Sequence, residues 1–179
     1  ISQVLKNSLL FLRHLQRVEL RRNGDLVAEV AIDRSAEEVM LEFKPSGELQ
    51  HWLVLSRTAD DVLLELGLRK KFEALDRLDR ATKVSVAVPL TSEAVEGALY
   101  AYLPTRQTTG MPVHVNGDFF PHDSRQAIVL EGEQHERYWN EALIATAAAA
   151  LAENFIRVRD LLGPTRFWTL AQAAFQRKG

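Results

Sequence analysis

A loop centred on Arg125 holds the residues of this 179-residue chain whose types are best suited to chemistry. The segment 121–126 reads Pro-His-Asp-Ser-Arg-Gln and lies just before an apolar run that begins at Ala127. Arginine carries a permanent charge on a planar fork of donors that matches the oxygens of a phosphate group. Arg125 is therefore a candidate for phosphate contact. From the residues alone, an ion pair of Arg125 with Asp123 or Glu131, or a solvated side chain, is the favoured interpretation.

The histidines around this loop give little support to a metal site. His114 alternates into a short strand and His122 follows a proline, and no third ligand is spaced to join them. His135 lies among glutamates that are typical of an acidic helix start, where carboxylates offset the helix dipole. The chain has no cysteine, which excludes a thiolate zinc site. We expect no metal site, and a His114–His122 pair is the weaker alternative.

Two polar loops flank one short strand in this part of the chain. A strand is predicted over residues 99–103, and Pro104 is expected to end it because proline has no N–H to give to a sheet. Residues 105–110 lack any apolar period and predict the first polar loop. A short alternating strand follows within 113–117 and ends at the turn pair Asn-Gly. Residues 121–126 form the second polar loop.

Several short motifs resemble, in the same order, a region of sacsin repeats and of their bacterial relatives. They read GALYAYLPT, TGMPVHVNGDFF, HDSRQAI and YWNEAL, and the likeness is strongest between Gly97 and Asn140. Those proteins carry an upstream ATP-binding domain of the type shared by histidine kinases, heat-shock chaperones, gyrase and mismatch-repair proteins. In the chaperones, a middle domain then contributes a loop whose basic residue reaches the terminal phosphate. The resemblance implies that this chain is such a middle-domain segment.

The resemblance also implies roles for individual residues. Ser124 and Arg125 stand where the chaperone relatives carry a Ser-Arg pair in the catalytic loop, so Arg125 is the expected catalytic residue. Its expected neighbours around the phosphate are Ser124, Gln126, Asn116 and Arg106. The chain would sense the phosphate for an upstream ATP-binding domain of the same protein and couple nucleotide state to domain docking. The alternative is a non-catalytic protein–protein interaction module that binds a client protein or a second copy of itself.

Nucleotide-binding motifs are missing from the chain itself. Its nine glycines form neither the Asp-x-Gly-x-Gly loop and glycine-rich lid of this ATPase superfamily nor a Walker-type loop. We therefore expect no cofactor and no enzymatic activity in this chain alone. ATP and magnesium would be held by the upstream domain.

The charge and the cysteine content of the chain limit the partners and the cellular compartment that we expect. A net charge of −2 offers no electrostatic footprint for nucleic acid or an anionic membrane. The basic residues of segments 13–22 and 69–71 are interpreted as solvated faces. Without cysteine, and without an apolar run of about twenty residues, a cytoplasmic location is expected. The first residue, Ile1, is neither an initiator methionine nor part of a signal peptide, which favours a fragment of a longer protein.

The remaining periodicities predict an α+β fold, with a mostly antiparallel sheet, helices packed on one face and a C-terminal helical segment. Predicted strands cover 15–22, 26–32, 39–43, 49–57 and 83–88, and predicted helices cover 2–14, 60–80, 134–155 and a segment after Gly163-Pro164. Asn23-Gly24 predicts a tight hairpin between the first two strands. We assign residues 1–133 to an α+β middle domain with two polar loops. Residues 134–179 are assigned to C-terminal helices packed on it as one compact unit.

Overall fold

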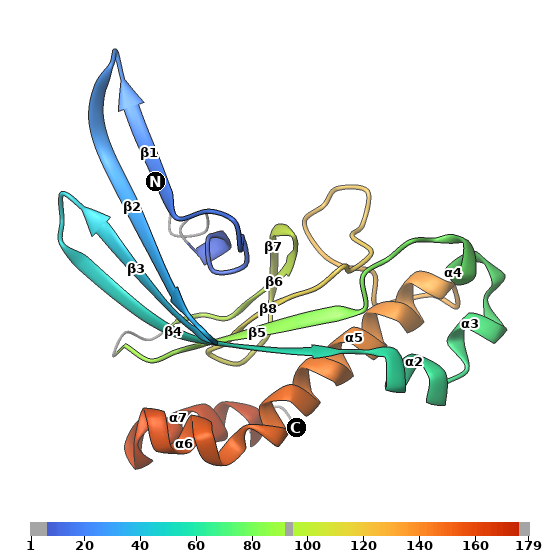
Figure 1. Cartoon of the computed structure of the whole chain (residues 1–179). Helices are drawn as coiled ribbons and strands as arrows, with labels where there is room; N and C mark the ends of the chain where they lie inside the picture. The colour runs from blue at the N-terminus through green and yellow to red at the C-terminus, as the bar shows by residue number, and fades with distance from the viewer. Residues whose placement is uncertain (1–6, 92–94, 176–179) are drawn as a thin grey trace.

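The computed structural model describes residues 7–91 and 95–175 and confirms the predicted α+β class (Figure 1). The described residues form eight strands, β1 (Arg17–Arg22), β2 (Asp25–Ser35), β3 (Glu38–Lys44), β4 (Glu48–Thr58), β5 (Lys83–Pro89), β6 (Ala98–Ala101), β7 (Leu103–Thr108) and β8 (His114–Asn116). They form one sheet in the order β1-β2-β3-β4-β5-β8-β6-β7. Each neighbouring pair is antiparallel except β6 and β8, which are parallel.

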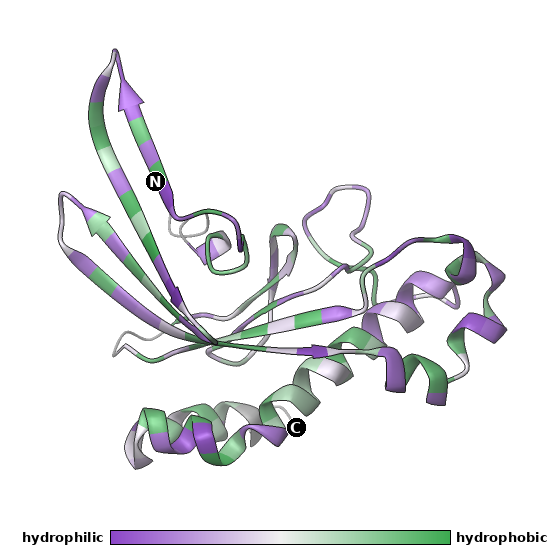
Figure 2. Cartoon of the chain, viewed as in Figure 1, coloured by the Kyte–Doolittle hydropathy of each residue, from purple (hydrophilic) through white to green (hydrophobic). Residues whose placement is uncertain are grey.

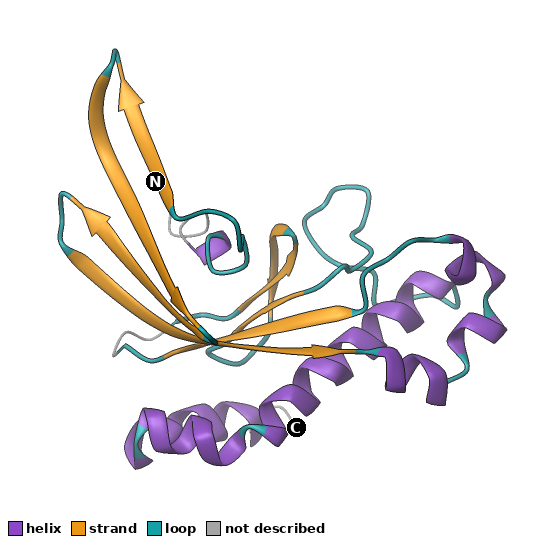
Figure 3. Cartoon of the chain, in the orientation of Figure 1, coloured by secondary structure: helices purple, strands orange, loops and turns teal. Residues whose placement is uncertain are grey.

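Helices lie beneath the sheet in the view of Figure 1 and at its right-hand end. They are α2 (Asp60–Glu65), α3 (Leu68–Lys71), α4 (Glu73–Arg77), α5 (His135–Glu153), α6 (Phe155–Leu162) and α7 (Pro164–Phe175). Figure 3 shows that α5, α6 and α7 all lie on the same side of the sheet. In the part of the chain that the structure describes, no helix combines the length and apolar character that crossing a membrane requires.

Strands β4 and β5 are buried on both faces. On the helix-covered face, Leu53, Leu55, Val86 and their neighbours share one core with α5. On the opposite face, which we call the N-terminal face, Trp52 belongs to a second core that includes side chains of residues 9 and 10. The short segment 7–13 therefore covers the face that the helices leave open, as Figure 1 shows above the sheet.

Helix α5 packs closely because it is rich in alanine. Ala142, Ala147 and Ala150 are buried against the helix-covered face. Small side chains let the helix backbone approach the sheet, as the sequence predicts. Figure 2 shows the apolar middle of α5 beneath the sheet and polar colours at its N-terminal end. The shared core makes the C-terminal helices and the sheet one packed unit.

The single helix predicted over residues 60–80 is wrong, because the chain forms three short helices there. Gly67 adopts a left-handed conformation with φ of 61° and Phe72 is extended, and each breaks the helical hydrogen bonding. The breaks also change which side chains face the core. Leu63 is buried, whereas Leu64, which a continuous helix would place on the same face as Leu68, is 78% exposed.

The helix predicted over residues 2–14 is confirmed at residues 7 and 8 but ends there, and residues 1–6 lie outside the described part. Residues 9–11 and 13–14 form turns instead. The guanidinium of Arg34 donates hydrogen bonds to the carbonyls of Leu9, Leu10 and Leu12 at 2.6–3.1 Å. Those bonds satisfy carbonyls that a continuous helix would otherwise pair internally.

The first polar loop is a further correction, because most of residues 105–110 belong to strand β7. The preceding strand ends at Ala101, and Tyr102, with φ of 61°, makes the turn into β7. Pro104 is tolerated because β7 is the edge strand of the sheet. Residues 114–116 then return as β8 and insert between β5 and β6. Of the two predicted polar loops, only residues 121–126 remain a loop.

Asn140 fastens the irregular segment after β8 to α5. Its side chain is fully buried, its Oδ1 accepts the N–H of Phe120 at 2.8 Å, and its Nδ2 donates to the carbonyls of Phe120 and Val129 at 2.9 and 2.8 Å. One amide thus pairs backbone groups on both sides of the remaining polar loop. The loop rises from a fixed base (tan, beside β7 in Figure 1).

We expect Asn140→Ala to lower the free energy of unfolding by about 3 kcal/mol, because it leaves backbone polar groups without partners. Asn154→Ala is the matched control, since that amide donates to one carbonyl only, at 2.9 Å near the end of α5. Its expected loss is about 1 kcal/mol. Urea unfolding of both variants measures the difference. Equal losses would contradict the fastening role.

Candidate functional site

A cavity of about 730 Å³ opens on the N-terminal face between segment 7–13, strands β6 and β7, and the 121–126 loop. Three of the residues predicted around a phosphate line it, namely Arg106, Arg125 and Gln126. Thr105, Thr108 and His114 contribute further polar groups. Segments distant in sequence therefore form one polar wall.

Backbone and side-chain hydrogen bonds join the 121–126 loop to the edge of the sheet. The N–H of Arg106 donates to the carbonyl of Gln126 at 2.7 Å. One residue further along β7, the Oε1 atom of Gln107 accepts the N–H of Ile128 at 2.9 Å. The first bond uses the free backbone edge of β7, and the second uses a side chain of the same strand. They fix the backbones that carry Arg106 and Arg125 next to each other.

Arg125 occupies a tight turn of the loop. Its φ is 54°, its N–H donates to the carbonyl of His122 at 2.7 Å, and the N–H of His122 donates to the carbonyl of Ala127 at 2.8 Å. A positive φ at a residue other than glycine is uncommon and is held here by these bonds. The Arg125 side chain is exposed, and it forms no ion pair with Asp123, Glu131 or any other carboxylate of the described residues.

Two predicted neighbours, Ser124 and Asn116, are not among the residues that line the cavity. The hydroxyl of Ser124 accepts the N–H of Gln126 at 3.4 Å within the exposed turn. The Oδ1 atom of Asn116 accepts the N–H of Tyr102 at 3.1 Å and supports the turn between β6 and β7. The side chains of Ser124 and Asn116 therefore stabilise backbone turns.

His114 forms the floor of the cavity and is 1% exposed. Its Nδ1 accepts the N–H of Ala98 at 3.1 Å, and its Nε2 lies 3.0 Å from the side-chain amide of Asn7. Since Nδ1 accepts, the neutral ring carries its proton on Nε2, and this tautomer requires the Asn7 amide to turn its oxygen, in place of Nδ2, toward the ring. Burial lowers the pKa of His114 to about 4. The ring is therefore neutral at pH 7.

No metal site forms around this histidine. Within the described ranges, no group of three or more potential ligands among His, Cys, Asp and Glu is positioned to hold a metal ion. His122 lies in the exposed loop and is not part of the cavity lining. His135 instead contacts Glu136, with Nδ1 3.3 Å from the carboxylate, and packs its ring edge-on against Phe120.

Tyr100 and Thr105 are lining residues that the sequence did not single out. Tyr100 is 1% exposed, and burial raises its pKa to about 12, although a hydrogen bond with Asn7 acts in the opposite direction. The hydroxyl of Thr105 donates to the carbonyl of Leu99 at 2.8 Å and accepts the N–H of Gln107 at 3.2 Å. Both groups are already engaged within the protein. They shape the cavity more than they offer donors to a ligand.

Gly97 lets the chain pass closely beside the segment that leads into β8. A Cβ atom at this position would lie 2.1 Å from the carbonyl oxygens of both Met111 and Val113, and 2.3 Å from the hydroxyl oxygen of Thr109. Those distances are far below contact distance. A glycine is therefore required where the lining segment of β6 crosses the 109–113 turn.

The groups left free to contact a ligand are mainly cationic. Arg106 and Arg125 are both exposed, and Glu96 is the acidic residue of the lining. Guanidinium groups donate in pairs to the oxygens of phosphates and carboxylates. The arrangement suits binding of an anion at the mouth of the cavity. It contains no buried nucleophile and base within hydrogen-bond distance of each other.

Comparison with known proteins gives no match: no family model, no curated protein and no solved structure matches this chain.

We expect His114 to make the fold sensitive to acid. Because its pKa is about 4 in the folded state and about 6.5 when unfolded, the unfolded chain binds the proton first as the pH falls. Stability is therefore present above pH 6.5 and is lost between pH 6.5 and 4, by about 3 kcal/mol from this group.

The measurement is urea unfolding of the wild type and of His114→Asn from pH 7.5 to pH 4. Asparagine retains an acceptor near the position of Nδ1 but does not titrate. Over this range the wild type should lose about 3 kcal/mol more than the variant. Parallel pH profiles would show that the ring is not held neutral by burial.

Proposed function

We propose that this chain is a middle-domain segment that contacts the terminal phosphate of a nucleotide held by an ATP-binding domain of the same protein. The observation that carries the proposal is the convergence of Arg106 and Arg125 at one cavity. The two arginines come from an edge strand and from a separate loop. In this proposal Arg125 is the catalytic residue and Arg106 assists in binding.

The charge balance of the cavity supports an anionic ligand. Arg106 and Arg125 have no carboxylate partner within the described residues, and the cavity's acidic lining residue, Glu96, is exposed to solvent. Two unpaired guanidinium groups can each donate two parallel hydrogen bonds. A terminal phosphate, with several equivalent oxygens and more than one negative charge, fits that set of donors better than a neutral ligand does.

Arg125 could act on phosphate transfer by electrostatics. A guanidinium group placed against the terminal phosphate stabilises charge that develops on its oxygens, and a closed, water-poor interface strengthens this effect. The exposed position of Arg125 at a turn suits contact across a domain interface. ATP and magnesium would be bound by the other domain, and this chain would add only its donors.

Docking of the two domains would follow the nucleotide state. The loop is joined to β7 by Arg106 and Gln126, so movement of the loop toward a phosphate would be transmitted to the sheet edge. Loops that contact a terminal phosphate are commonly ordered by it and released after hydrolysis. The order of motifs that resembles sacsin repeats supports the same arrangement of domains.

An interaction module is the second candidate, and exposed apolar side chains on the C-terminal helices favour it. Ile156 on α6 is 63% exposed and Trp168 on α7 is 61% exposed. Large apolar groups at the surface are often contact points for another protein. Such a surface would serve a client protein or a second copy of the chain, and α6 and α7 lie on the opposite side of the sheet from segment 7–13.

We expect Arg125→Ala to lower the rate of ATP hydrolysis by the full-length protein on the order of a hundredfold. Arg125→Lys should restore only part of the rate, because a point charge cannot reproduce the planar fork. The melting temperature should remain nearly constant, since the Arg125 side chain forms no ion pair with the described residues. Steady-state hydrolysis and thermal melting measure the two effects.

Arg22→Ala is the matched control, because Arg22 is an exposed arginine on the distant strand β1. Its hydrolysis rate should equal that of the wild type. An unchanged rate in Arg125→Ala, or equal losses in both variants, would contradict the proposed role.

We also expect the 179-residue chain alone to show no measurable ATP hydrolysis, because it lacks the motifs that enclose a nucleotide. Calorimetry with ATP and magnesium should show only weak binding that salt abolishes, as for an exposed anion contact. Micromolar, magnesium-dependent binding by this chain would contradict the proposal that another domain holds the nucleotide.

A further inference from the structure

A second polar cavity lies on the N-terminal face, on the other side of segment 7–13. Its volume is about 380 Å³, and Arg13, Arg34, Ser56, Lys83 and Ser85 contribute its polar wall. They come from the N-terminal segment and from strands β2, β4 and β5. None of them lines the cavity that contains Arg106 and Arg125. The two cavities are therefore separate sites.

The cations of this cavity are not neutralised by the protein. Neither Arg13, Arg34 nor Lys83 forms an ion pair with a carboxylate anywhere in the described ranges. The acidic lining residue, Glu37, is paired with Arg157 of α6. Three positive charges thus border one small cavity.

Arg34 supplies charge from a fixed position. Its terminal nitrogens donate to backbone carbonyls of segment 7–13, and its Nε atom is buried without a hydrogen-bond partner. Carbonyl groups satisfy its donors but do not cancel its charge. Burial lowers the pKa of Arg34, and the charge of Arg13 lowers it further. The pKa of Lys83 is lowered in the same way, by burial and then by Arg13.

Two hydroxyl groups stand beside these charges. Ser56 and Ser85 face each other across β4 and β5, and their oxygens lie 3.0 Å apart. One guanidinium nitrogen of Arg13 donates to the Ser56 hydroxyl at 3.2 Å. The serines occupy interior strands of the sheet, so their backbone positions are fixed. Charged and neutral donors therefore meet at one end of the cavity.

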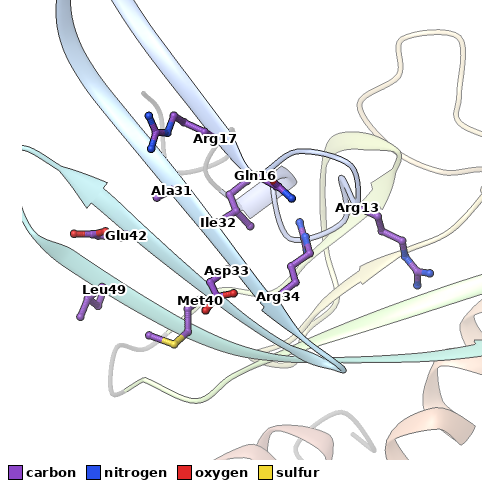
Figure 4. Close-up of a pocket in the computed structure, with 10 residues that line it drawn as sticks. All are labelled: Arg13, Gln16, Arg17, Ala31, Ile32, Asp33, Arg34, Met40, Glu42 and Leu49. Carbon is purple, nitrogen blue, oxygen red and sulfur yellow. The ribbon is translucent and has the colours of Figure 1, made fainter.

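Figure 4 shows a neighbouring cavity of about 830 Å³ that shares Arg13 and Arg34 with this one. The guanidinium of Arg13 points away from Arg17 and Glu42 in that view. The neighbouring cavity is lined by two carboxylates, Asp33 and Glu42, beside its three arginines. The smaller cavity has three cations beside a single carboxylate, Glu37, so its excess of positive charge is larger.

We propose that this smaller cavity binds a phosphate group, with Arg13 and Lys83 as its charged donors and the Ser56 and Ser85 hydroxyls as its neutral donors. A tetrahedral dianion can accept from several directions and match more than one cation, whereas a carboxylate offers two oxygens in one plane. The volume is at the lower end of the range of about 300–1,000 Å³ that is typical of small-molecule sites.

Another part of the cavity wall suits the organic part of a small phosphate ester. It is formed by apolar side chains, among them Leu10, Val39 and Val54. A phosphate held at the serines would place an attached carbon group against this wall. The shared chemistry is the phosphate group, and the apolar wall favours an ester over the free ion.

The test is an NMR titration of the chain with inorganic phosphate and, separately, with phenyl phosphate, at constant ionic strength. It is performed in the Arg106→Ala, Arg125→Ala background, so that the other cavity does not contribute. Saturable shifts of the Ser56 and Ser85 amides are expected, with a dissociation constant on the order of 1 mM or tighter. Tighter binding of phenyl phosphate would identify an ester as the ligand, and equal binding would identify the free ion.

Arg13→Gln and Lys83→Gln should each weaken binding at least about tenfold, because each removes a charge-assisted hydrogen bond. Arg22→Gln, which changes an exposed arginine on β1, should leave binding unchanged. Ser56→Ala separates the hydroxyl contribution from that of charge and should weaken binding less.

Absence of saturable shifts at Ser56 and Ser85 would overturn the proposal, as would binding that survives both Arg13→Gln and Lys83→Gln. Either result would leave the role of Arg125 in ATP hydrolysis untouched. Conversely, an unchanged hydrolysis rate in Arg125→Ala would not affect this site. The two proposals therefore fail independently.

Discussion

Burial of β4 and β5 on both faces is the constraint on which the rest of the structure depends. Each apolar side chain buried on these strands contributes about 1.5–3 kcal/mol, so neither face can remain in water. Helix α5 covers Leu53, Leu55 and their neighbours, and its alanines allow close contact. Segment 7–13 must then cover Trp52 on the other face. Among the described residues, a short segment of one helical end and several turns takes this role.

Covering one face with so short a segment leaves polar cavities on both of its sides. Asn7 faces the cavity of Arg106 and Arg125, and Leu10 and Arg13 face the cavity of the serines. Turn hydrogen bonds within the segment are supplemented by hydrogen bonds to the sheet. Arg34 donates to its carbonyls and His114 pairs with Asn7. The groups that hold the segment also shape the two candidate sites.

The sequence predicted those elements whose geometry is set by neighbouring residues. The hairpin at Asn23-Gly24 forms with positive φ at both residues, 52° and 93°, as that pair requires. Strand β7 was missed because its residues are polar, and its pairing with β6 and with Gln126 is not visible in local periodicity. The helix predicted over residues 60–80 was too long, because the spacing of apolar residues does not show that Gly67 adopts a left-handed conformation and ends the first helix.

The sequence predicted part of the candidate site, because only some of its residues can be recognised without knowing the contacts between distant segments. Arg106, Arg125 and Gln126 have side chains whose chemistry is readable without a fold, and they line one cavity. Tyr100 and Gly97 contribute through contacts with residues distant in sequence, so no local pattern marks them. His114 did leave a signal. It alternates with Val113 and Val115, which places its ring on the opposite face of the sheet from both valines.

The placement of ion pairs explains how a chain with net charge −2 presents positive cavities. Its carboxylates are used in pairs along the helices and at the sheet margins, as in Arg57 with Asp61 and Glu153, and Arg80 with Asp118. The N-terminal face keeps cations that have no such partner in the described part of the chain: Arg13, Arg34, Lys83, Arg106 and Arg125.

Mutual repulsion among unpaired cations raises the energy of the unliganded state. An anion from outside relieves that repulsion and forms new hydrogen bonds in the same step. The face that α5, α6 and α7 leave open is thus the face on which the charge distribution favours an anionic ligand.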